Sequence, residues 1–314
     1  MEEMESYLGW KIDFTEPAGE PGYCAPDSVR WKVFKNPVTS VIAGVCAVLL
    51  EFADDRIRSG VWDHSVFPTD PVGRGRRTGL AAYVGIYGPQ SAARRVIQGV
   101  TNMHARVEGK TPNGRAYRAL DPELLNWVAA TASYGWLTAY DRFAKKLSEE
   151  EKQRFWAEGE EVGKLYGVTY SPRSLDDFHA MMSNLEADFE PHDINSDFLE
   201  IIRSGKAARV MPKRMQRAFA HAAIDILPPS VRRVLGLGSE YDLTALDNIM
   251  IRAAAWAAET FPNKKSPPAE ASERLGLPRD FLWKSSAAQT RLLQQARTRM
   301  QTDAMSGELQ TEQL

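Results

Sequence analysis

A histidine on the apolar face of a predicted helix is the first residue in this chain whose placement suggests chemistry. In the segment TNMHARVEG, His104 shares a stripe, at steps of three and four, with three aliphatic residues: Ile97, Val100 and Val107. That spacing predicts a helix over residues 90–108, ended by Gly109, with the imidazole turned inward. An inward imidazole is most often a core residue bonded to a carbonyl or carboxylate; the alternative is a neutral ligand for a metal or cofactor. Haem iron needs only one protein axial ligand, so a lone histidine suits haem better than zinc.

A second group of reactive side chains lies in EFADDRIRSGVWDHSVF, residues 51–67. It contains three candidates for a general base: Glu51, Asp54 and His64. A carboxylate in an apolar cavity acquires a raised pKa, which suits it to accept a proton near neutral pH. The alternative is a solvated helix end whose acids cap helices and pair with Arg56 or Arg58.

Arg74 and Thr78 follow in the segment DPVGRGRRT and lie four residues apart. If a helix begins near Gly73, both side chains share one face and could bind a carboxylate, a propionate or oxygen. The alternative is an exposed basic turn, because Arg76 and Arg77 lie alongside.

The elements that must position these residues are predicted to be helical. Capping residues and helical spacing predict helices over 90–108, 121–146, 148–167, from Ser174 onward, 206–225 and 241–260. No six residues alternate convincingly between polar and apolar, and no hairpin dipeptide joins β-branched runs. We therefore expect an all-α fold. It consists of a loose N-terminal arm at 1–24, one large helical domain at 25–262, and a tail at 263–314 that is partly helical or disordered.

Composition limits the partners of the chain. The formal net charge of -2 gives no electrostatic case for nucleic-acid binding. Two cysteines and an acidic start without a secretory signal favour the cytoplasm. The longest apolar run, VIAGVCAVLL at 41–50, has ten residues, whereas a membrane-spanning helix needs roughly 20. We expect a buried helix there and no transmembrane segment, with peripheral membrane contact as the alternative.

Taken in order, several segments resemble the MpaB/rubber oxygenase catalytic domain family, which includes the latex clearing proteins. The similar segments span roughly residues 25–262: LLEFADDRIRSGVWDHSVF, DPVGRGRRT, IYGPQSAARRVIQGVTNMHARVEG, GRAYRALDPELLNWVAATASYGWLTAYDRF and LPPSVRRVLGL. Each segment alone is weak evidence, whereas their order and spacing make the resemblance specific.

The resemblance implies a mostly helical, globin-related domain that binds one haem b through a proximal histidine. By this resemblance, His104, in the element H-x-x-V-x-G, is the expected haem ligand. Arg74 and Thr78 are expected at the haem pocket. Characterised members cleave carbon-carbon double bonds of isoprenoid chains with dioxygen. The resemblance therefore implies O2 and an apolar small molecule as substrates.

Two positions depart from the rubber oxygenases. Those enzymes can place a lysine before the matched threonine as a distal ligand, whereas this chain has Arg77, which stays protonated. The glutamate that serves as a base in those enzymes would fall near Arg58 in this chain. Glu51, Asp54 and His64 are therefore the candidates for a base at a shifted position.

The expected function is thus haem b-dependent oxygenation or cleavage of a C=C bond in an isoprenoid or lipid. Two alternatives stay open at this stage. One is a haem-binding sensor or carrier without turnover, because a proximal histidine specifies ligation and not reaction. The other is a haem-free helical protein that binds lipids or a partner, with His104 as a core residue.

Overall fold

The fold is organised around two apolar helices that cross closely, α2 (Pro37–Glu51) and α6 (Pro122–Ala139). The structure is a computed structural model, which describes residues 6–7, 10–67, 69–203 and 212–311. The Asn36 side chain caps α2 and the Asp121 side chain caps α6, and each helix then starts with proline. The apolar run at 41–50 lies within α2, and seven of its ten residues are buried, whereas Val41 is 44% exposed.

Gly135 of α6 sets the distance of closest approach between these two helices. A Cβ atom at this position would lie 2.6 Å from the carbonyl oxygen of Ala43 in α2. Only glycine lets the two backbones come this close. Four residues earlier, Thr131 of α6 faces Glu51, so the helices run antiparallel.

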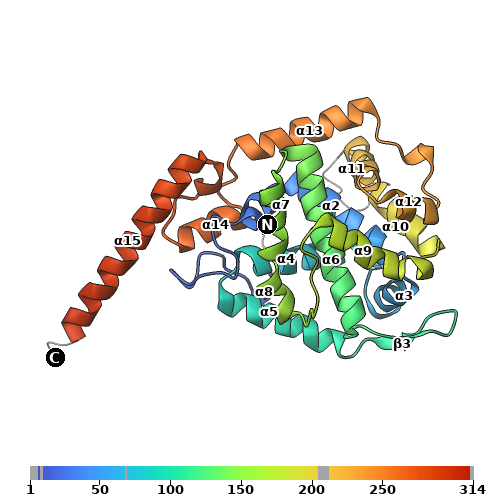
Figure 1. Cartoon of the computed structure of the whole chain (residues 1–314), viewed down its shortest axis with the longest axis horizontal. Helices are drawn as coiled ribbons and strands as arrows, with labels where there is room; N and C mark the ends of the chain where they lie inside the picture. Colours follow the sequence, from blue (N-terminus) through green and yellow to red (C-terminus); the bar gives the residue numbers. More distant parts are fainter. Residues whose placement is uncertain (1–5, 8–9, 68, 204–211, 312–314) are drawn as a thin grey trace.

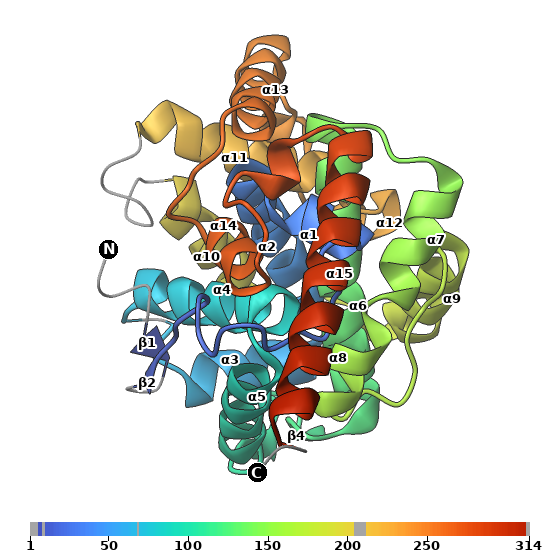
Figure 2. The same cartoon turned by 90° about the vertical axis from the view of Figure 1, so that its left-hand side faces the viewer.

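Other helices surround the α2–α6 pair, which lies near the centre of the molecule in Figures 1 and 2. They are α1 (Val29–Phe34), α3 (Asp55–His64), α4 (Pro71–Tyr87), α5 (Gln90–His104), α7 (Glu149–Ala157), α8 (Glu160–Leu165), α9 (Leu175–Leu185), α10 (Asp193–Arg203), α11 (Lys213–Asp225), α12 (Pro229–Val234) and α13 (Ala245–Thr260). The tail adds α14 (Pro267–Arg274) and α15 (Ser286–Thr311), and α15 extends away from the body in Figure 1. Short π and 3-10 turns cover Tyr140–Ala144, Glu186–Asp188, Ser239–Tyr241 and Phe281–Trp283.

The described chain is mostly helical and has one continuous hydrophobic core, which confirms the helical class and a single domain. A globin-related arrangement stays a prediction. Within the described residues, no helix combines the length and apolar composition that a membrane crossing needs.

The prediction of a fold without strands was wrong at two places. Strands β1 (Ser6–Tyr7) and β2 (Trp10–Lys11) pair near the N-terminus, and β3 (Glu108–Lys110) pairs with β4 (Ala116–Arg118). The helix predicted over 90–108 therefore ends at His104, and Gly109 lies in β3 opposite Tyr117. A Cβ at Gly109 would lie 2.7 Å from the Tyr117 hydroxyl oxygen, so this glycine makes room for the cross-strand ring.

Three other predicted helices have different boundaries. The helix over 148–167 is two helices, α7 and α8, because Gly159 leaves space for the Arg30 guanidinium. A Cβ there would lie 1.9 Å from Arg30 Nη2, which also contacts Ser133. The helix over 206–225 is described from Lys213, and residues 206–211 lie outside the described residues. The helix over 241–260 starts at Ala245.

The described part of the N-terminal arm is packed and not loose. Arg274 of α14 is 2% exposed and donates hydrogen bonds to three backbone carbonyls: Phe14 at 2.8 Å, Glu20 at 2.9 Å and Tyr87 at 2.7 Å. Phe14 and Ile12 are also buried in the core. The arm is ordered by a residue of the tail, a contact that local composition does not reveal.

Replacing Gly135 by alanine should lower the free energy of unfolding by about 1–3 kcal/mol, because the methyl group would force α2 and α6 apart. Urea denaturation followed by circular dichroism measures this change. Gly44→Ala is the matched control, since a Cβ at Gly44 of α2 meets no atom within 4 Å. Equal stability of both variants would show that the helices can separate without cost.

Candidate functional site

The helical hairpin of α4 and α5 brings Arg74 to His104. The two helices are joined at Gly88 and Pro89, and the charge of Arg74 in the first turn of α4 acts on His104, the last residue of α5. His104 is half-buried at the end of α5. Burial, and secondly the positive charge of Arg74, lower the pKa of His104 below its usual value. The imidazole is therefore neutral at neutral pH.

Glu51, the last residue of α2, lies at the same place. Its carboxylate Oε1 is 3.3 Å from the hydroxyl of Thr131 in α6. Burial raises the pKa of Glu51 to about 7, and both Thr131 and the charge of Arg74 act against that rise. Arg74 is thus within electrostatic range of both Glu51 and His104. Three residues singled out in separate sequence segments converge on one site.

α2 and α4 interact at two places. At one end the hydroxyl of Tyr83 in α4 donates to Ser40 of α2 over 3.3 Å. At the other end Glu51 of α2 interacts electrostatically with Arg74 of α4. The two helices therefore run antiparallel, with Ser40 opposite Tyr83 and Glu51 opposite Arg74.

Along this stretch seven positions are at least partly accessible, and four of them are glycine or serine. They are Ser40, Gly44, Val48 and Glu51 of α2, and Gly75, Gly79 and Tyr83 of α4, at helical steps of three and four. A Cβ added at Gly44, Gly75 or Gly79 would have no neighbour within 4 Å. We call this open strip the α2–α4 groove. Buried residues of α2 border the groove on one side, and most of the second half of α4, from Leu80 onward, is also buried in the core.

Thr78 lies in α4 one turn after Arg74, as predicted. Its hydroxyl donates to the Arg74 carbonyl oxygen over 3.1 Å, and its side chain is exposed. Helix α4 begins at Pro71, with Asp70 as its cap, close to the predicted start at Gly73. Arg77 lies 3.7 Å from Asp70 in a partly exposed ion pair.

The other candidate bases are held in contacts away from the groove. Asp54 caps α3, is fully buried, and its carboxylate accepts three hydrogen bonds from Arg56, at 2.7, 2.8 and 3.1 Å. His64 is exposed, and its Nε2 lies 3.1 Å from the hydroxyl of Tyr117 in β4. Arg58, at the position of the family's glutamate, is buried and pairs with Glu190 at 2.6 Å.

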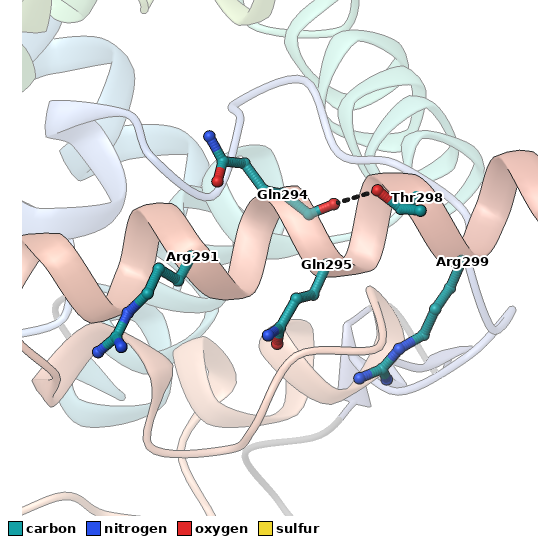
Figure 3. A pocket seen from close by; sticks show the side chains of 5 residues that line it. All are labelled: Arg291, Gln294, Gln295, Thr298 and Arg299. Carbon is teal, nitrogen blue, oxygen red and sulfur yellow. Dashed lines mark hydrogen bonds between the residues drawn. The ribbon is translucent and has the colours of Figure 1, made fainter.

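His104 is the candidate metal-binding residue at the groove. Its ring forms no hydrogen bond with any residue that the structure describes, so its donor nitrogen is not used by the core. Among the described residues, no three His, Cys, Asp or Glu side chains are grouped so that they could hold a metal ion. A shallow hollow on α15 lies elsewhere, and all of its lining residues belong to that one helix (Figure 3).

Sequence reasoning missed the residues that shape the groove. Thr131, Ser40 and Tyr83 become relevant only when α2, α4 and α6 are packed together. The glycines carried a usable signal, because Gly75 and Gly79 lie one turn apart inside a helix, where glycine is unfavourable.

Glu51→Gln should change the pH dependence of stability in protein without added haem. A carboxyl group whose pKa rises from 4.5 to about 7 on folding stabilises the protein when protonated, and that stability is lost as pH rises through this range. The variant should match the wild type near about pH 4 and be more stable by up to about 3 kcal/mol near about pH 8. Urea denaturation at several pH values measures this. A difference that is constant with pH would contradict a buried titrating carboxylate.

Comparison with protein families gives one match. The model described as "ER-bound oxygenase mpaB/B'/Rubber oxygenase, catalytic domain" matches residues 31–260, from α1 to the end of α13. Comparisons with curated proteins and with solved structures gave no match. The matched range contains the α2–α4 groove and His104. This chain belongs to the family of the ER-bound oxygenase mpaB/B' and rubber oxygenase catalytic domains.

Proposed function

We propose that this protein is a haem-dependent oxygenase that uses O2 on a C=C bond of an apolar isoprenoid or lipid. The observation that carries the proposal is the convergence of Glu51, Arg74 and His104 on one groove inside the family's catalytic domain. These residues come from three helices, and packing alone brings them together.

The residues at the groove fit a haem. His104 offers a neutral imidazole that no other described residue engages, which is the form that binds iron. Three glycines line the groove with open space at each, so a flat ring can approach both backbones closely. Arg74 provides a permanent positive charge for a propionate. Haem b, when bound, would supply the dioxygen chemistry.

Glu51 is the base that the geometry favours. With a pKa of about 7 it is partly ionised at neutral pH, so it can accept a proton from an allylic carbon and release it again. The Thr131 hydroxyl donates a hydrogen bond to Oε1 of Glu51, so Oε2 of Glu51 is the oxygen that receives the proton. The carboxylate of Asp54 is already held by Arg56, and His64 is exposed beside Tyr117.

An aromatic cluster includes Phe52, the residue directly after Glu51 in the sequence. Phe52, Phe67 and Phe198 form a cluster with ring centroids 5.6–6.1 Å apart, and all three are buried. Such walls hold an unsaturated chain and limit water at the reacting bond. Arg77, paired with Asp70, cannot act as the lysine ligand of the related enzymes.

His104→Ala should abolish haem binding while the fold is retained. The wild-type protein, titrated with haemin and reduced, should develop a Soret band, and the variant should not. His179→Ala is the matched control, because His179 is exposed on α9, far along the chain from α4 and α5. Gly79→Leu should also weaken haem binding, since leucine would fill the groove.

Ala253→Leu is the control for the second variant, because Ala253 is an exposed small residue in α13. Far-UV circular dichroism checks that each variant is folded. A wild-type protein without a Soret band after haem addition would contradict the haem assignment. An unchanged spectrum in His104→Ala would show that another residue is the ligand.

Steady consumption of O2 in the presence of an unsaturated isoprenoid is the test of oxygenase activity. Haem-loaded wild-type protein should consume O2 and release carbonyl fragments, measured with an oxygen electrode and mass spectrometry. Glu51→Gln should lower the rate by about 100-fold or more, as expected when a general base is lost. Its residual rate should lose the rise with pH near about 7 that ionisation of Glu51 gives the wild type. Reversible O2 binding without consumption would instead indicate a sensor or carrier.

A further inference from the structure

The outer face of α13 exposes large apolar side chains. Ile249 is 63% exposed, Trp256 61% and Leu246 51%, and Phe261, directly after the helix, is 65% exposed. Positions 246, 249, 253 and 256 recur at steps of three and four, so these residues form one stripe along the helix. Single exposed apolar residues are normal, whereas a continuous stripe marks an interaction surface.

The two aromatic residues of this stripe are presented together. The rings of Trp256 and Phe261 pack edge to face, with centroids 6.1 Å apart and planes at 89°. Each ring is held by the other while both stay more than half exposed. The α13 helix lies along the upper edge of the molecule in both Figure 1 and Figure 2, so a flat surface can approach it.

The charge that this face presents outward is positive. Arg252, Lys264 and Lys265 are exposed, and none of them forms an ion pair with a residue that the structure describes. The three carboxylates between residues 241 and 266 are each paired, over 2.6–3.5 Å: Asp242 with Arg232, Asp247 with Arg214 and Glu259 with Lys35. Three cations without an ion pair to a described residue therefore flank the apolar stripe, although Arg252 also donates to the Arg142 carbonyl, and the exposed Glu240 precedes the segment.

This charge pattern argues against a second copy of the chain as the partner. A two-fold contact through α13 would bring the same cations of both copies together. The segment offers no unpaired carboxylate to meet them, so like charges would oppose the contact.

We propose that the α13 face binds the surface of an anionic lipid bilayer. We define the α13 face as Leu246, Ile249, Ala253, Trp256 and Phe261 with the cations Arg252, Lys264 and Lys265. The helix lies in the plane of the membrane, the paired rings enter the boundary between headgroups and acyl chains, and the cations contact lipid phosphates. This inference does not depend on the haem or on the oxygenase activity.

Vesicle flotation with the full chain tests this proposal. Wild-type protein should float with vesicles of phosphatidylcholine and phosphatidylglycerol, and much less with phosphatidylcholine alone. Trp256→Ser/Phe261→Ser should weaken partitioning by on the order of tenfold or more, because two ring insertions are lost. Lys264→Glu/Lys265→Glu should remove the preference for the anionic vesicles. Tyr170→Ser is the matched control, since Tyr170 is an aromatic residue that is 51% exposed outside α13.

Several outcomes would overturn the proposal. One is a wild type that does not float with either vesicle, which would leave an acidic protein as the partner to be sought. Another is a double variant that partitions as well as the Tyr170→Ser control. A third is a wild-type dimer, seen by size-exclusion chromatography with light scattering, that the double variant lacks. Circular dichroism establishes that the variants are folded, and their substituted side chains are all on the surface.

Discussion

The close crossing of α2 and α6 is the constraint on which the rest of the structure depends. Gly135 lets the two backbones meet at Ala43, and this contact fixes the rotation of α2 about its axis. That rotation buries one side of α2 in the core and turns the strip from Ser40 to Glu51 toward α4. It also places the Glu51 carboxylate against Thr131. The groove and its acid are therefore consequences of how these two helices pack.

Burial and one permanent cation together set the charge state of the site. Arg74 makes protonation of the nearby His104 less favourable, and it partly offsets the cost of ionising the buried Glu51. A guanidinium suits this position because it keeps its charge across the physiological pH range. The same charge therefore keeps the imidazole in its ligand form and allows the carboxylate to exchange a proton.

Local signals predicted the local features of this protein, and packing determined the rest. The caps at Asp121 and Ser148 follow from interactions within one helical turn, and the structure shows them, whereas His104 is half-buried. The convergence of Glu51 with Arg74 could not be read from spacing, since it depends on how α2 lies against α4. The β3–β4 hairpin was missed although Asn113-Gly114 is a turn dipeptide, because its strands have only three residues each. The break at Gly159 depends on Arg30, which is more than a hundred residues away.

The hydrogen bonds from Arg274 to the carbonyls of Phe14 and Glu20 have a consequence for the order in which this protein folds. Residues 12–24 leave the ribosome well before Arg274 does. The Arg274 guanidinium, which binds the carbonyls of Phe14 and Glu20, follows these residues by 260 and 254 positions. Ile12 and Phe14 therefore do not reach their final burial until α14 has been synthesised. Contacts of such long sequence separation also form late in folding, because closing so large a loop is entropically costly. Completion of the core is thereby coupled to synthesis of the chain as far as α14.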